Sequence, residues 1–170
     1  MTKIGRGLAA LCAVMLAGCA GYSWTSAVPQ DRRTVAVPTF RNESSVTELG
    51  SAITRQTLRE FQREGTYSIR TVGDSALEVQ GVVRDSHSRT VAYGRTTGDR
   101  NREHRLSATA VVSFIDKTSG RVLVDNRVYK ADVTFLASDD ILTGERDAAG
   151  RLAEEFAQQI VDDALELKWE

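Results

Sequence analysis

The stretch RLSATAVVSFIDKTSGRVLVDNRVYKADVTF, residues 105–135, decides the fold. It contains two long runs of strand-like composition, separated by the tetrapeptide KTSG at residues 117–120. Gly120 supplies the backbone freedom that a tight turn between two strands needs. The stretch therefore predicts a hairpin of two long strands.

Two further strands are predicted upstream of this hairpin, on either side of a helix. TVAVPTF, residues 34–40, favours a strand that ends or lies at a sheet edge at Pro38, because proline has no N–H to donate to a ladder. TYSIRTV, residues 66–72, alternates as a strand. A strand, a helix and a strand in a run of this length indicate a right-handed βαβ unit.

The segment between these strands predicts an amphipathic helix. Ser45 and Glu48 have the spacing of a capping box, and Gly65 is a plausible stop. Charged and polar residues fall on the opposite side from a broad apolar face, so the helix is expected to pack by one side. That face carries Val46, Leu49, Ile53, Thr57, Leu58 and Phe61.

The rest of the chain completes an α+β pattern. Leu77, Val79 and Val82 have strand-like spacing, and the C-terminal segment repeats apolar residues at three- and four-residue steps, which is typical of a helix. The expected order is β-α-β-β-β-β-α. We expect two helices packed on one face of a four- to five-stranded mixed sheet, with the other face less covered and available for contact.

The N-terminus has the features of an export signal. Lys3 and Arg6 precede an apolar run of signal-peptide length, which is too short to span a membrane as a helix. LAGC, residues 16–19, resembles a bacterial lipobox, whose cysteine is acylated and becomes the mature N-terminus; the alternative is a chance cysteine in an ordinary signal peptide. The lipobox interpretation makes Cys19 the lipidation site.

The expected organisation follows from this cleavage. Residues 1–18 are a signal peptide that is removed, residues 19–33 are the lipidated cysteine and a tether, and residues 34–170 are a single domain. Several acyl chains give firm anchoring. Ala20 after the cysteine resembles the signal for sorting to the outer membrane, so we expect a lipid-anchored protein on its periplasmic face.

Cysteine usage and charge exclude several classes of function. Cys12 is removed and Cys19 carries lipid, which leaves no thiol for a disulfide, a metal cluster or catalysis. Removal of Lys3 and Arg6 with the signal peptide changes the net charge of the chain from −1 to −3, which argues against a nucleic-acid binder. The charge is uneven: residues 84–105 carry six arginines against three acids, whereas residues 139–170 have a net charge of −7.

The sequence contains no recognisable catalytic or metal-binding motif. His87 and His104 lie in polar, loop-like segments without further ligands at a suitable spacing, so they are expected to be solvated side chains. Adjacent aspartates at 139–140 and 162–163 point apart rather than converging as an acid and a base. We therefore expect no enzyme activity and no cofactor besides the lipid on Cys19.

The order of motifs resembles the LptE family of outer-membrane lipoproteins that take part in lipopolysaccharide assembly. CAGYSW, VAVPTFRNES, an amphipathic helix, ALEVQGVV, EHRLSATAVVSFIDKTSGRVLVDNRVY and a final helix follow one another over nearly the whole mature chain. The resemblance implies a plug within the β-barrel LptD that assists barrel folding and binds lipopolysaccharide during its transport to the outer leaflet.

The resemblance also implies ligand contacts from basic side chains near the tip of the loop between the middle strands. Arg95, Arg100 and Arg102 occupy that stretch here and could pair with phosphates or acidic sugars, since guanidinium binds such groups bidentately. The alternative is an ordinary solvated loop. A second basic position of the family, before the last helix, is not matched, because Asp139 and Asp140 dominate that segment.

A competing hypothesis keeps the lipoprotein and the α+β domain but assigns a different role. Strand motifs similar to VAVPTF also occur in periplasmic adaptors of a curli-secretion-like or TolB-N-like kind. A secretion channel needs further alternating amphipathic strands to build a pore, and the chain is too short to supply them.

Overall fold

The computed structural model describes residues 28–93, 102–137 and 141–169. A short 3-10 helix, η2 (Gln30–Arg32), precedes strands β1 (Thr34–Ala36) and β2 (Arg41–Asn42), helix α2 (Leu49–Glu64) and strand β3 (Ser68–Ile69). Three long strands follow, namely β4 (Leu77–Tyr93), β5 (Arg102–Asp116) and β6 (Val122–Ala137), and helix α3 (Ile141–Leu165) comes last. The predicted α+β class is confirmed.

The strands form one mixed sheet in the order β3-β1-β4-β5-β6, with β2 also paired to β4. β1 runs parallel to both β3 and β4, as a βαβ connection through α2 requires. β4, β5 and β6 are antiparallel, and Gly120, at φ +74°, closes the predicted β5–β6 hairpin. The sheet has six strands, one more than the upper expectation, because Arg41 and Asn42, directly after the segment expected to form the first strand, form the short strand β2.

The first strand ends next to Pro38, as predicted. β1 stops at Ala36, and the backbone N–H of Phe40 leaves the sheet to donate to Thr54 Oγ1 of α2 at 3.0 Å. The Phe40 ring fills the space over Gly81 of β4, where a Cβ atom would lie only 2.3 Å from Phe40 Cε2. The chain then rejoins β4 as β2, with Arg41 opposite Val82.

Helix α2 has the expected end but not the expected beginning. Gly65 adopts a left-handed conformation and donates its N–H to Phe61 O, which caps the helix. The predicted capping box is wrong: no side chain caps the N-terminus, and the Ser45 hydroxyl instead lies 3.0 Å from both the carbonyl and the hydroxyl of Ser86 in β4. The serine serves a tertiary contact because β4 passes next to the helix start.

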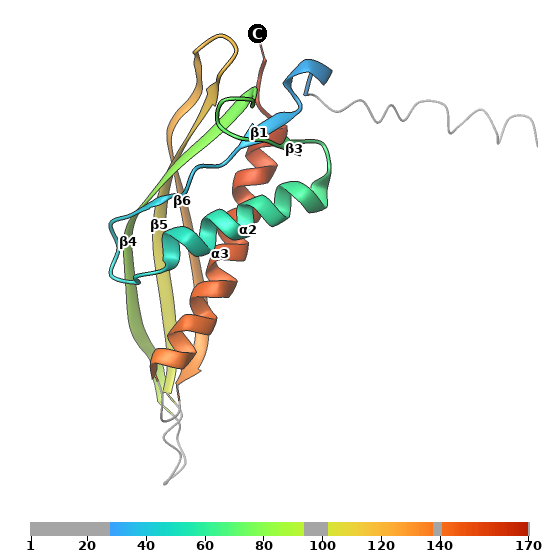
Figure 1. Cartoon of the computed structure of the whole chain (residues 1–170). Coiled ribbons are helices and arrows are strands. Elements are labelled where there is room, and N and C mark those ends of the chain that lie inside the picture. Colours follow the sequence, from blue (N-terminus) through green and yellow to red (C-terminus); the bar gives the residue numbers. More distant parts are fainter. Residues whose placement is uncertain (1–27, 94–101, 138–140, 170) are drawn as a thin grey trace, which may run out of the picture.

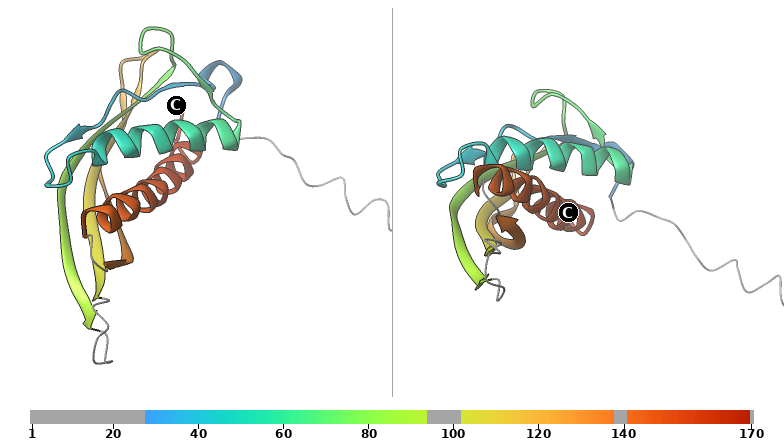
Figure 2. Two further views of the ribbon diagram at one scale, coloured as in Figure 1. Left: turned by 60° about the horizontal axis from the view of Figure 1, so that its bottom comes forward. Right: turned by 90° about the horizontal axis from the view of Figure 1, so that it is seen from below.

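Both helices cover one face of the sheet (Figures 1 and 2). α3 follows the length of the long strands, while α2 begins beside β4 and crosses α3. The core lies between these layers and is apolar, and each fully buried side chain of this size stabilises the fold by about 1.5–3 kcal/mol. Its largest buried members include Phe61, Phe114, Phe156, Leu49, Ile53, Leu77, Leu106, Leu152 and Ile160.

The two ends of the sheet differ in what they carry. The proximal end, as we call it, holds η2, the β5–β6 turn and the C-terminal residues after α3 (Figure 1). The distal end is the opposite one, where β4 ends at Tyr93 and β5 begins at Arg102. The first described element therefore lies at the proximal end, and the connection between β4 and β5 starts and finishes at the distal end.

Candidate functional site

The candidate site lies on the outer face of the sheet, which we define as the face opposite the two helices. Strand alternation separates the two faces: Leu106 and Ala108 of β5 point into the core, and Arg105 and Ser107 point outward. No helix or loop of the described residues packs over the outer face of β5 and β6, as the two views in Figure 2 show. The expectation of a less covered face is therefore met.

Three valines form a row across the middle of this face. Val82 of β4, Val111 of β5 and Val128 of β6 are direct cross-strand partners. Val82 and Val111 are half-buried by their neighbours, and Val128 is 56% exposed. An uncovered apolar row on a sheet face is a typical contact surface for another molecule.

The distal half of the outer face is polar and basic. His87 and Arg89 of β4 lie opposite Ser107 and Arg105 of β5, and Asp132 of β6 lies opposite Ser107 on the other side. These residues and Val91 line a hollow of about 230 Å³. Arg105 Nε lies 3.4 Å from Asp132 Oδ2, and both side chains are about half exposed.

Register shifts in β4 place these side chains on one face. The β4–β5 pairing shifts by one residue between Val83 and Asp85, and again between Thr90 and Ala92. Each bulge reverses which residues face the helices. Val83 and Ser86 are consequently both buried, and His87 and Arg89 both point outward.

A packed layer supports this half of the sheet from the helix side. His104 is only 8% exposed, and its ring stacks on Phe135 of β6 with centroids 5.5 Å apart. α3 comes close at Gly144, where a Cβ atom would lie 2.9 Å from the Phe135 ring. The expectation that His104 is a solvated loop residue is wrong, because β5 extends through this position and turns the ring inward.

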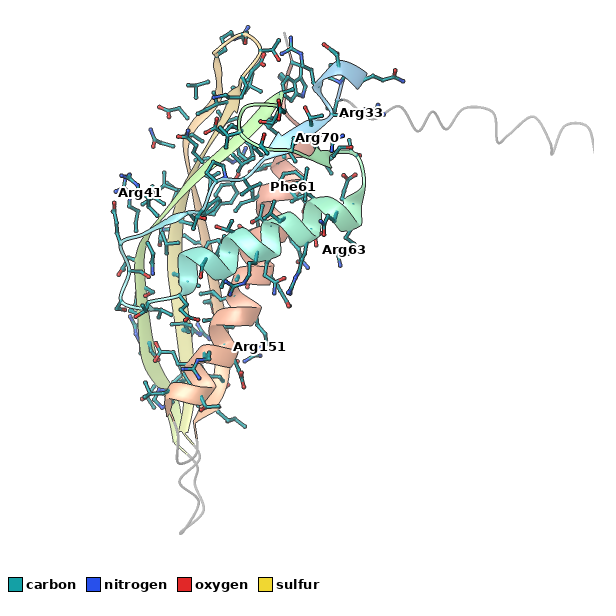
Figure 3. The ribbon with its side chains drawn as sticks, in the orientation of Figure 1. Arg33, Arg41, Phe61, Arg63, Arg70 and Arg151 are labelled. Atoms are coloured by element: carbon teal, nitrogen blue, oxygen red, sulfur yellow. The ribbon has the colours of Figure 1, made fainter. Side chains whose placement is uncertain are left out.

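Side chains of α3 also bind the free edge of β6. Arg151 Nη2 donates to the carbonyl of Thr134 at 2.8 Å, and Figure 3 shows Arg151 on the part of α3 that follows the distal half of the sheet. Near this edge, burial and the negative charge of Asp132 raise the pKa of the Glu155 carboxyl above its usual value. The helix thus fixes the edge strand and adds negative charge behind it.

The predicted site residues are only partly described by the structure. Cys19, Arg95 and Arg100 lie outside the described residues. Arg102 begins β5 at the distal end, where its Cα is paired with Tyr93 of β4 and with Ala137 of β6. The sequence places Arg89 and Arg105 within a basic segment but does not predict that they face each other, because a single sequence does not show strand register.

The structure offers no support for a metal site or a spanning helix. Within the described residues, no group of three or more histidine, cysteine or acidic side chains could hold a metal ion. Among the helices of the same residues, none is both long enough and apolar enough to cross a membrane. The outer face carries arginine donors beside exposed apolar side chains at Val91 and Leu136.

Similar folds occur in bacterial lipoproteins of known structure. Lipoprotein B from Nitrosomonas europaea is 14% identical and superposes with a TM-score of 0.53, covering 82% of this chain and 85% of that one. A minor lipoprotein from Acinetobacter baumannii is 12% identical, with a TM-score of 0.52 and coverage of 79% and 94%. These likenesses define the class by its fold, a two-layer α+β domain.

The family is defined by the sequence itself. The family model described as "LptE: Lipopolysaccharide-assembly" matches residues 32–164, which include every strand and nearly all of α3. The chain belongs to the LptE family. No curated protein matches the sequence significantly.

Proposed function

We propose that this protein is an outer-membrane lipoprotein that acts as plug and assembly partner of an LptD-type β-barrel in lipopolysaccharide transport. The anchor is the lipid on Cys19, and the distal end of the sheet contacts lipopolysaccharide. Membership of the LptE family supports the pathway. The uncovered valine row on the outer face is the observation that carries the partnership with a barrel.

A plug must match the wall that surrounds it. The lumen of a large barrel is polar, and the outer face offers mostly polar and charged side chains around the valines. Val82, Val111 and Val128 give this face a central apolar strip, which contacts water when no partner is bound. Its burial against a partner would be favourable, since apolar area contributes about 25 cal/mol per Å² removed from water.

The anchor would hold the proximal end near the membrane. Val28, the first described residue, lies nine positions after Cys19, and a fully extended chain of nine such steps spans at most about 30 Å. The distal end lies at the other end of the long strands (Figure 1). The β4–β5 hairpin would thus extend from the anchored leaflet into the barrel.

Co-purification from outer membrane extracted with mild detergent tests this proposal. We expect the protein to be recovered with a β-barrel several times its size, identified by mass spectrometry. Val128→Lys should reduce the recovered barrel, because it places a charge in the valine row. Val72→Lys, at a 41% exposed position outside the row, is the matched control and should leave recovery unchanged. Recovery of the wild-type protein without any barrel would overturn the proposal.

A further inference from the structure

Arg89 and Arg105 face each other across β4 and β5. Their Cα atoms are register partners, and both side chains are exposed on the outer face. Direct cross-strand neighbours have Cβ atoms only about 4.5–5.5 Å apart, and like charges at this spacing destabilise a sheet. The pair therefore indicates a place where an anion fits between two cations.

The surrounding carboxylates do not neutralise the pair. Among the described residues, Asp132 approaches Arg105, at 3.4 Å from Nε, and none lies within 4 Å of the Arg89 guanidinium. The Arg105–Asp132 contact joins two half-exposed side chains, and such surface pairs contribute little. Asp85 of the same face lies 3.5 Å from His87 Nδ1. Arg89 thus has no carboxylate partner among the described residues, although it lies directly opposite a second arginine.

The geometry selects a phosphate over a carboxylate as the bound anion. A phosphate monoester has three terminal oxygens and a charge near −2, so it can accept paired hydrogen bonds from two guanidinium groups at once. A planar carboxylate has only two oxygens to divide between them. The hollow of about 230 Å³ that Arg89 and Arg105 line has Val91 at its wall, which gives the remainder of an amphipathic ligand an apolar contact.

We propose that Arg89 and Arg105 bind a phosphate group of lipopolysaccharide on the outer face of the sheet, in its distal half. This inference rests on the proposed function and deepens it by assigning a second contact site to the ligand. The site lies on two paired strands backed by the His104–Phe135 stack, so both arginines are held by the sheet before the ligand arrives.

The test measures binding of the full mature lipoprotein, in detergent, to purified lipopolysaccharide and to the same material after removal of its phosphates. Arg89→Gln and Arg105→Gln should each raise Kd for the phosphorylated ligand about 10-fold, as expected for loss of a charge-assisted hydrogen-bonded pair. The double variant should lose less than the product of the single effects, because the two arginines share one phosphate. Binding of the dephosphorylated ligand should be equal in all variants.

Two controls separate binding from structure. Arg70→Gln removes an exposed arginine of the proximal region, seen in Figure 3 far from Arg151, and should leave Kd unchanged. The melting temperature of ligand-free Arg89→Gln should equal or exceed that of the wild type, since the substitution removes repulsion. Arg89→Lys keeps the charge but loses the planar fork, so it should recover only part of the affinity.

Three outcomes would overturn the inference. The first is equal affinity of wild type and both glutamine variants for the phosphorylated ligand. The second is an equal loss for the dephosphorylated ligand, and the third is displacement of the ligand by inorganic phosphate at a comparable concentration, which would identify a free-anion site. Co-purification with a barrel is measured separately, so arginine-dependent phosphate binding without a barrel would contradict the proposed function and leave this site standing.

Discussion

Arg32 Nη1 donates to both carboxylate oxygens of Asp116, at 2.6 and 2.7 Å. The Asp116 side chain is 5% exposed and also accepts hydrogen bonds from the N–H and hydroxyl groups of the β5–β6 turn. The Arg32 guanidinium lies 5.7 Å from the centre of the Trp169 ring. One arginine therefore joins the start of the domain, the hairpin turn and the C-terminal residues at the proximal end.

Removal of this arginine should destabilise the protein. We expect Arg32→Ala to lower the free energy of unfolding by about 2 kcal/mol, because a nearly buried carboxylate loses a charged hydrogen-bond donor. For a domain of this size the melting temperature should fall by about 4–8 °C. Arg70→Ala, which removes an exposed arginine that binds only the neighbouring Ile69 carbonyl, is the control and should melt as the wild type does. Equal melting of both variants would contradict the assigned role.

The same carboxylate predicts how stability depends on pH. Burial alone would raise the pKa of Asp116, but hydrogen bonds from Ser119 and Thr118 and the charge of Arg32 outweigh it and hold the pKa below the usual value. A group whose pKa is lowered in the folded state stabilises the protein above its unfolded pKa of about 3.9 and loses that contribution as the pH falls through the folded value.

Urea unfolding of wild type and Asp116→Asn at a series of pH values checks this dependence. The difference in stability between them should be constant from pH 7 to about 5 and shrink progressively below about pH 4. A difference that stays constant down to pH 2 would show that the carboxylate is not perturbed by folding.

Local patterns predicted the fold well where they coincided with tertiary packing. The hairpin with its turn at Gly120, the stop at Gly65 and the strand end near Pro38 each depend on the backbone chemistry of one residue, and all three are confirmed. The predicted apolar face of α2 is also confirmed at Leu49 and Phe61, which are fully buried. Such features need no knowledge of distant contacts.

The distal end could not be predicted for a physical reason. Two bulges interrupt the period-2 pattern of β4, so a polar segment that resembles a loop is in fact strand as far as Tyr93. The burial of His104 depends on its stack with Phe135, 31 positions away, and Ser45 binds Ser86 rather than its own helix. The opposed arginines at 89 and 105 likewise depend on register, which no local pattern specifies.

Two glycines in the structure predict substitutions of opposite sign. Gly81→Ala would place a Cβ atom 2.3 Å from a carbon of the Phe40 ring, which is itself buried in the core. We expect a loss of about 1–3 kcal/mol from overpacking. Gly150 lies inside α3 with nothing within 4 Å of its added Cβ, so Gly150→Ala should stabilise the protein by about 0.4–1 kcal/mol. Chemical denaturation measures both, and a loss for Gly150→Ala would contradict the open environment assigned to it.

The loop arginines lead to a prediction about salt. Charge reversal of Arg95, Arg100 and Arg102 to glutamate should weaken binding of purified lipopolysaccharide at low ionic strength, because three cations between the end of β4 and the start of β5 in the sequence become anions. The effect should shrink as salt rises, since the screening length falls from about 10 Å at 0.1 M to about 3 Å at 1 M.

A matched triple variant distinguishes local contact from net charge. Reversal of Arg55, Arg59 and Arg70 changes the total charge equally but alters exposed arginines of α2 and the β3–β4 connection, away from the outer face. If the loop arginines contact the ligand, the loop variant should lose affinity at least 10-fold more than the matched variant at about 0.05 M salt, a differential of about 1.4 kcal/mol. Equal losses would mean that the affinity for lipopolysaccharide depends only on the total charge of the protein. Unchanged affinity in both variants would mean that the loop is an ordinary solvated segment.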